Sequence, residues 1–125
     1  MKIKKNIPLI DQHDKNYMYG GKFGGNFIPE TLKKPVDDLT KLFTKLRKDK
    51  KFIKERNHYF ETYIGAPTPF IKLENLTDHL GGAQIYAKVV SEAKGGAHKI
   101  YGATVHCMIA KKAGKKYVVG DTGAG

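Results

Sequence analysis

The chain has 125 residues, with 23 lysine and arginine residues against 12 aspartate and glutamate residues, a formal charge of +11 and an isoelectric point near 9.7. This length allows one domain, and 40% apolar residues exclude a wholly disordered chain. A single cysteine, Cys107, excludes a disulfide framework and a cysteine-rich zinc site, and we predict no metal site. No apolar run approaches the roughly 18 residues of a membrane helix, so we expect a cytoplasmic protein with no membrane partner.

The positive charge by itself does not indicate nucleic-acid binding. Only Arg47 and Arg56 are arginine, whereas base readout and bidentate phosphate contacts favour arginine over lysine. A nearly all-lysine excess is more typical of a coding bias than of a recognition surface. A basic protein that binds nucleic acid without specificity is therefore the last of three functional hypotheses.

The first half of the chain predicts a short lead and then two helices. Residues 1–16 form a basic lead that is too short for a signal peptide and too acidic for a transit peptide. Residues 17–29, YMYGGKFGGNFIP, contain too many glycines for a regular helix. Helices are expected over about residues 35–64, the first with Pro35 in its first turn and the second with Asp49 as its N-cap. An apolar stripe at helical spacing supports the first helix: Val36, Leu39, Leu42, Phe43 and Leu46.

The second half predicts a strand, a helix and a strand over about residues 84–120. Residues 85–87 and 117–119 are short apolar runs, and residues 98–113 between them carry apolar side chains at helical spacing, with Gly114 after the last turn. This order is typical of a βαβ unit with parallel strands and a right-handed crossover. The predicted fold class is therefore α/β, with amino-terminal helices followed by a parallel βαβ unit.

Ligands of such units bind beyond the carboxyl ends of the strands. Lys99 lies there, at the start of the predicted helix and directly after Gly95-Gly96-Ala97-His98. A neutral lysine amine attacks aldehydes, and desolvation, nearby cations and the positive end of a helix all favour the neutral form. A Schiff base to an aldehyde cofactor is the chemistry that most needs such a lysine. The alternative is a solvated lysine at a helix start.

The terminal loop, Asp121-Thr122-Gly123-Ala124-Gly125, has two physical interpretations. Its successive backbone N–H groups are suited to a nest for a carboxylate or a phosphate. The same letters resemble the Asp-Thr-Gly-Ala loop of aspartic proteases. In retroviral proteases, however, that loop lies early in the chain and a flap and further strands follow it.

Taken in order, several motifs resemble the amino-terminal part of the tryptophan synthase β chain, a pyridoxal-phosphate enzyme family of fold type II. The resemblance covers residues 17–125 as one partial domain. The motifs are YGGKFGGNFIPETL at 19–32, GAPTPF at 65–70, LGGAQIYAK at 80–88, GAHKI at 96–100, AKKAGKK at 110–116 and DTGAG at 121–125. The family fold is larger, so the resemblance implies an incomplete piece of it.

The resemblance implies a lyase of amino-acid biosynthesis that uses pyridoxal 5′-phosphate to join L-serine and indole into L-tryptophan. Lys99 would form the Schiff base and later transfer protons, and His98 would lie near the cofactor phosphate. Asp121 stands where the family has a catalytic glutamate. The loop that holds the substrate carboxylate would begin with Thr122, Gly123, Ala124 and Gly125. The implied partners are the tryptophan synthase α chain, which supplies indole, and a second β chain.

Departures from the family pattern bear on activity. Asp121 is one methylene shorter than glutamate, and residues 88–95 lack most of the polar side chains of the family's loop. The family chain also continues far beyond the glycine loop that ends this sequence. We therefore expect a truncated chain that is inactive, or nearly so, by itself. The alternative is a non-catalytic remnant or a partner-binding module.

Overall fold

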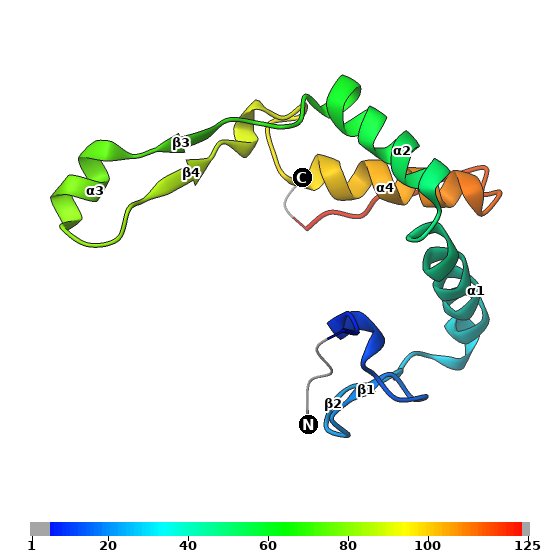
Figure 1. Ribbon diagram of the computed structural model, residues 1–125. Helices are drawn as coiled ribbons and strands as arrows, with labels where there is room; N and C mark the ends of the chain where they lie inside the picture. Colours follow the sequence, from blue (N-terminus) through cyan, green and yellow to red (C-terminus); the bar gives the residue numbers. More distant parts are fainter. Residues whose placement is uncertain (1–5, 124–125) are drawn as a thin grey trace. The chain divides into compact units, whose positions relative to one another are not determined.

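The computed structural model describes residues 6–123 and divides the chain into two compact units, one reaching to Asp38 and the other starting at Leu39 (Figure 1). The first unit contains a 3₁₀ turn, η1 (Leu9–Asp11), and an antiparallel hairpin of β1 (Met18–Tyr19) and β2 (Phe23–Gly24). The Asp14 carboxylate accepts the backbone N–H groups of Asn16 and Met18 and so closes the turn before the hairpin. The glycine-rich segment thus contains a short hairpin and no regular helix, which agrees with its composition.

Helix α1 (Glu30–Leu46) begins five residues earlier than expected, because Pro29 and not Pro35 marks its start. The N–H of Leu32 donates to the carbonyl of Pro29 at 2.9 Å. Pro35 lies inside the helix, where it lacks the N–H that would bond the carbonyl four residues earlier. Ion pairs Lys33–Glu30 and Lys34–Asp38 flank the proline on the exposed surface, where such pairs add little stability.

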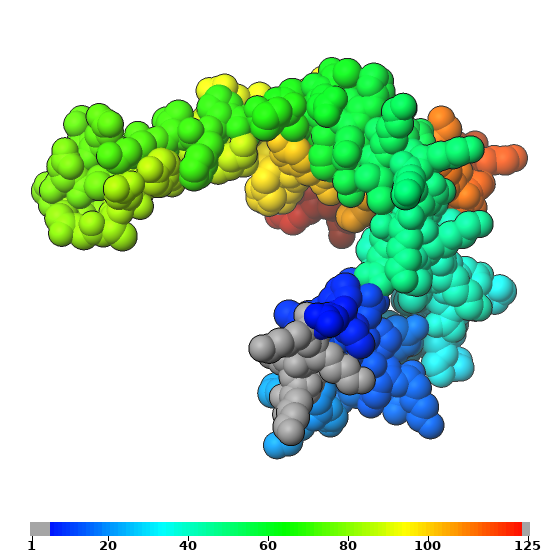
Figure 2. Space-filling view, viewed as in Figure 1, coloured from blue at the N-terminus to red at the C-terminus, as the bar shows by residue number. Residues whose placement is uncertain are grey.

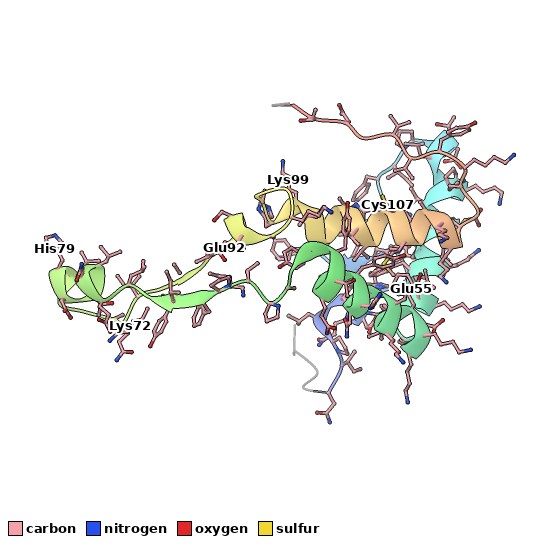
Figure 3. The ribbon with its side chains drawn as sticks, turned by 90° about the horizontal axis from the view of Figure 1, so that it is seen from above. Glu55, Lys72, His79, Glu92, Lys99 and Cys107 are labelled. Atoms are coloured by element: carbon pink, nitrogen blue, oxygen red, sulfur yellow. The ribbon has the colours of Figure 1, made fainter. Side chains whose placement is uncertain are left out.

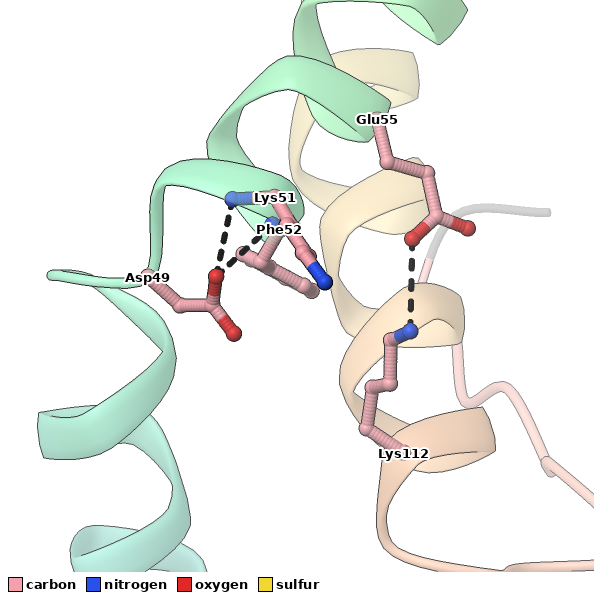
Figure 4. A network of polar contacts seen from close by, with 5 residues as sticks. All are labelled: Asp49, Lys51, Phe52, Glu55 and Lys112. Carbon is pink, nitrogen blue, oxygen red and sulfur yellow. Dashed lines mark hydrogen bonds and ion pairs between the residues drawn. The ribbon is translucent and has the colours of Figure 1, made fainter.

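Helix α2 (Lys50–Tyr59) confirms the predicted N-cap. The Asp49 carboxylate accepts the N–H groups of Lys51 at 2.8 Å and Phe52 at 3.4 Å (Figure 4). A π-helical turn, η2 (Phe60–Ile64), continues the helix, and Gly65 ends it with a left-handed φ of 87°. The expected end of this helical region is therefore correct, because a left-handed residue favours glycine.

An arm follows in which β3 (Phe70–Lys72) and β4 (Tyr86–Lys88) pair antiparallel, with α3 (Glu74–Leu80) connecting them. The Thr77 hydroxyl donates to the Leu73 carbonyl and accepts the Ile85 N–H, which joins α3 to the entry of β4. Figure 2 shows this arm, coloured green to yellow, as a narrow projection. Its strands are mostly exposed, so the apolar run at 85–87 is not a buried strand.

Helix α4 (Lys99–Lys112) agrees with the prediction for residues 98–113, and Gly114 follows with a left-handed φ of 71°. Residues 117–119 form no strand. Their side chains are 87%, 59% and 92% exposed. Over residues 6–123 both strand pairs are antiparallel, so the predicted parallel βαβ unit is not observed. The physical reason is that β4 hydrogen-bonds to β3, a nearby strand that the periodicity did not reveal, and no described strand lies beside 117–119. The fold is thus mixed helix and short antiparallel strand.

The core of the second unit lies where α4 and α2 pack together with the C-terminal end of α1. Leu46, Phe52, Met108 and Ile109 form its buried cluster, with Leu42 and Val105 packed against it. An ion pair between Lys112 and Glu55, 3.4 Å apart, joins the same two helices at the surface (Figure 4). Burial of apolar side chains supplies most of the stability here, because a half-exposed ion pair contributes little. Among the described helices, none is long and apolar enough to span a bilayer.

The N-cap of α2 can be tested by substitution of Asp49. Asp49→Ala removes the acceptor of two backbone N–H groups, so we expect the free energy of unfolding to fall by about 1 kcal/mol. Urea unfolding followed by far-ultraviolet circular dichroism measures the change. Asp49→Asn is the matched control, because asparagine caps as well as aspartate. Equal loss in both variants would contradict the assigned cap.

Candidate functional site

The segment that precedes Lys99 is anchored to the end of η2. After β4 the chain makes a 3₁₀ turn, η3 (Val90–Glu92), and Ala93 is then buried to 3% exposure. The N–H of Lys94 donates to the carbonyl of Ile64 at 2.9 Å, and Ile64 is itself 1% exposed. This buried contact positions the loop from its N-terminal side.

Aromatic contacts hold the same region from both sides of Lys99. The Lys94 ammonium lies 4.0 Å from the centroid of the Tyr63 ring, a cation–π geometry. On the other side, Tyr101 packs edge-to-face on Phe60, with ring centroids 5.2 Å apart. Because Tyr63 and Phe60 both belong to η2, the backbone at Lys99 is held between two contacts with one short turn.

A glycine turn reverses the chain between these anchors. Gly95 and Gly96 have φ values of 84° and 71°, and the N–H of Gly96 donates to the carbonyl of Ala93 at 2.8 Å. Left-handed backbone at two successive residues favours glycine. The turn delivers the chain to the first residue of α4.

Lys99 is that first residue, and its side chain is exposed (Figure 3). His98 is the N-cap residue with helical φ and ψ, and its side chain makes no capping hydrogen bond. His98 is also exposed, and its carbonyl accepts the N–H of Tyr101 at 3.2 Å. The predicted lysine therefore lies at a helix start with His98 as its neighbour, as the sequence indicates, but in contact with solvent.

The terminal loop lies on a segment that turns back toward the start of α4 (Figures 1 and 3). Asp121, Thr122 and Gly123 are exposed, and the Asp121 carboxylate accepts the N–H of Thr122 at 2.9 Å. Within residues 6–123, no hydrogen bond or ion pair joins Asp121 to Lys99. Ala124 and Gly125 lie outside the described residues. The structure thus brings His98 and Lys99 together and does not bring Asp121 into contact with them.

Sequence reasoning assigned no role to one polar contact at the base of the arm. Thr68 is 4% exposed, and the Lys88 ammonium donates a hydrogen bond to its carbonyl. The Thr68 hydroxyl is buried and has no hydrogen-bond partner among the described residues. Both residues lie in motifs of the sequence, at 65–70 and 80–88, but periodicity does not reveal that the two motifs meet.

The described residues supply a positioned lysine rather than an enclosed site. The Lys99 side chain is open to solvent, and contacts on both sides of it in the sequence hold its backbone. A hollow of about 480 Å³ lies elsewhere, along one face of α2, and is lined by Lys50, Ile53, Lys54, Asn57, His58 and Glu61. None of these is a predicted site residue. Over the described part of the chain, no cluster of three or more His, Cys, Asp or Glu is placed to hold a metal ion.

Comparison with known proteins supports the resemblance carried by the motifs. The chain is 42% identical over 107 residues to the tryptophan synthase beta chain of Fusobacterium nucleatum subsp. nucleatum. The match covers 86% of this chain and 27% of that relative. No family model matches the chain. The chain is therefore similar to part of a tryptophan synthase β chain over most of its own length, and it spans about a quarter of the relative it matches.

The buried alanine before the glycine turn tests how the loop is positioned. Ala93→Leu should lower the free energy of unfolding by about 1–3 kcal/mol, because the added side chain overpacks a site with no space. It should also reduce the hydrogen-exchange protection of the Lys94 amide, which bonds the Ile64 carbonyl. Ala97→Leu is the control, since Ala97 is exposed in the same loop. Unchanged protection in Ala93→Leu would show that this contact does not hold the loop.

Proposed function

We propose that this chain is the lysine-bearing part of a tryptophan synthase β-like enzyme of fold type II. The reaction is the pyridoxal-phosphate-dependent condensation of L-serine with indole to give L-tryptophan. The observation that carries the proposal is the 42% identity over 107 residues, in a chain whose GAHKI motif starts a helix with an exposed lysine. The short chain by itself is inactive, because its described residues leave Lys99 open to water.

Lys99 is the residue that attaches the cofactor. Its amine is the nucleophile toward the cofactor aldehyde, and the contacts at Ala93 and Tyr101 hold its backbone in place. When bound, pyridoxal phosphate withdraws electrons from the α-carbon of an amino acid and so allows its β-substituent to be exchanged. The same Lys99 amine would take a proton from the α-carbon and return it.

The neighbours of Lys99 have supporting roles in this proposal. His98 donates toward the cofactor phosphate from the N-cap position of α4. Thr122 and Gly123, with Ala124 and Gly125 beyond the described residues, bind the substrate carboxylate through backbone N–H groups. The Thr122 N–H donates to the Asp121 carboxylate in the chain alone and must leave it to bind the substrate. Asp121 acts as the acid or base that glutamate provides in the family. These groups are exposed in the chain alone, so further residues must enclose them.

The partners follow from the same resemblance. A tryptophan synthase α chain would supply indole, and a second β chain would complete the enzyme. Serine and indole are small and neutral overall, so their recognition does not depend on the charge of +11. The lysine side chains of α1 and α2 therefore have no assigned role in the proposed chemistry, whereas the apolar side chains of these helices pack against α4.

A chimera tests the role of Lys99 in a complete enzyme. Residues 17–125 of this chain replace the matched part of the Fusobacterium nucleatum relative. After treatment with pyridoxal phosphate and borohydride, peptide mapping should find the added phosphopyridoxyl mass on Lys99. Lys99→Met should lose this label and should lower tryptophan formation from serine and indole by at least about a hundredfold. Lys111→Met, an exposed lysine in the last turn of the same helix, should retain both, whereas label spread evenly over exposed lysines would refute the assignment.

The same chimera tests Asp121. Asp121→Glu restores the missing methylene and should raise kcat by roughly tenfold to a hundredfold, because a misplacement of about 1 Å costs about that much. Asp121→Asn keeps the size and removes the charge, so it should give no gain. An unchanged kcat in Asp121→Glu would show that residue 121 does not occupy the catalytic position. Steady-state tryptophan formation is the measurement.

A further inference from the structure

The two sides of the arm stay aligned beyond the end of its strands. Within the sheet, Phe70 of β3 is paired with Lys88 of β4. Further along both segments, the N–H of Lys94 donates to the carbonyl of Ile64 at 2.9 Å. Lys94 lies as many positions after Lys88 as Ile64 lies before Phe70, so the two segments between these pairs keep the antiparallel alignment of the strands.

Few hydrogen bonds hold these two segments together between the pairs. Residues 65–69 contain two prolines, which have no N–H to donate. Within the described part of the chain, a 2.9 Å bond from the Val89 N–H is the only backbone hydrogen bond between 65–69 and 88–93. A side chain supplies a second link, because the Lys88 ammonium donates to the carbonyl of Thr68.

The hydrogen bond of Lys88 is suited to holding backbone in place. Its donor is charged, and charge-assisted hydrogen bonds are stronger than neutral ones. Its acceptor belongs to Thr68, which is only 4% exposed, so water has little access to that residue. The Thr68 hydroxyl has no partner among the described residues. The ammonium is therefore bound through the backbone of Thr68 and not through its side chain.

The segment 88–94 leads directly into the glycine turn that precedes Lys99. Its first residue is bound to the Thr68 carbonyl and its last residue to the Ile64 carbonyl. The core cluster holds the C-terminal part of α4, where Met108 and Ile109 are buried, but not its first turn. The position of Lys99 therefore depends on how well the preceding segment is held.

We infer that Lys88 is a positioning residue for Lys99. Its hydrogen bond to Thr68 keeps the segment 88–94 in alignment, so that the glycine turn delivers the first residue of α4 to one place. Lys88 acts through the backbone and has no assigned contact with cofactor or substrate. The effect of Lys88 on the reaction rests on the proposed function, whereas its effect on the loop is measurable without any activity.

Hydrogen exchange in the 125-residue chain tests the effect on the loop. Lys88→Met keeps the apolar stem and removes the donor, so the amides of Val89 and Lys94 should exchange faster by about tenfold or more. The amides of Met108 and Ile109, in the core cluster, should keep their rates. Lys88→Arg should restore slow exchange, because a guanidinium also donates to a carbonyl.

Lys72→Met is the matched control for this experiment, because it removes the same charge from an exposed position of the paired strand (Figure 3). It should leave the exchange of Val89 and Lys94 unchanged. The inference is overturned if Lys88→Met exchanges as the unmodified chain does. Equal acceleration at Met108 and Ile109 also overturns it, since the variant then destabilises the whole unit.

Kinetics of the chimera test the effect on the reaction. Lys88→Met should lower kcat for tryptophan formation by about tenfold or more, because a misplacement of about 1 Å costs up to about a hundredfold. Counting kcat per Lys99 that takes up phosphopyridoxyl label removes any contribution from unfolded enzyme. The KM for serine should change by less than about threefold. Lys88→Arg should restore kcat, and Lys72→Met should not lower it.

The two proposals fail separately. An unchanged kcat in Lys88→Met, or an equal fall in Lys72→Met, overturns the positioning role and leaves the proposed function in place. Label on Lys88 instead of Lys99 overturns both. If no chimera takes up label at Lys99, the proposed function fails, whereas faster exchange in Lys88→Met alone still supports the link between Lys88 and the loop.

Discussion

The packing of α4 across α2 is the interaction on which the candidate site depends. Phe52 of α2 and Met108 and Ile109 of α4 lie in one buried cluster with Leu46. A helix as short as α4 is marginal in water by itself, and Gly102 weakens it further. Tertiary packing therefore holds the helix, and the contacts of η2 with Lys94 and Tyr101 then fix where it begins. Lys99 takes its place from this arrangement.

The amount of apolar surface left in water explains why one good helix contact does not make a complete site. A chain of this length can bury roughly two-thirds of its unfolded surface. Among the described residues the buried apolar side chains are few: Leu46, Phe52, Ile64, Ala93, Met108 and Ile109. Many large apolar residues remain exposed, from Phe27 in the first unit to Val119 near the end. Exposed apolar groups of this size are characteristic of interaction surfaces.

The chemistry of Lys99 depends on how far its side chain is shielded from water. A lysine amine becomes a selective nucleophile when protein groups replace water around it. Here the loop fixes the position of the Lys99 backbone but does not shield its side chain from water, since His98, Lys99 and Asp121 are all exposed. The position of Lys99 and the environment of its amine are thus set by different parts of the structure. The loop and α4 provide the first, and the described residues do not provide the second.

Local chemistry in the sequence determined the helix ends and the place of the lysine. Asp49 caps α2, Gly65 and Gly114 follow helical segments in left-handed backbone, and Lys99 begins α4, because these features depend on residues only a few positions apart. The start of α1 was predicted wrongly because Pro35 directly precedes the apolar stripe, whereas the helix begins directly after Pro29.

The tertiary structure alone decided which strands pair. The run at 85–87 and the run at 117–119 look alike in sequence, but the first pairs antiparallel with β3 and the second pairs with no described strand. Pairing depends on hydrogen bonds to another segment of the chain, and the residues of a short apolar run do not identify that segment. The hydrogen bond of Lys88 to Thr68 likewise joins segments whose contact is not evident from the sequence. Composition shows that a side chain is apolar, and only the folded chain shows whether anything covers it.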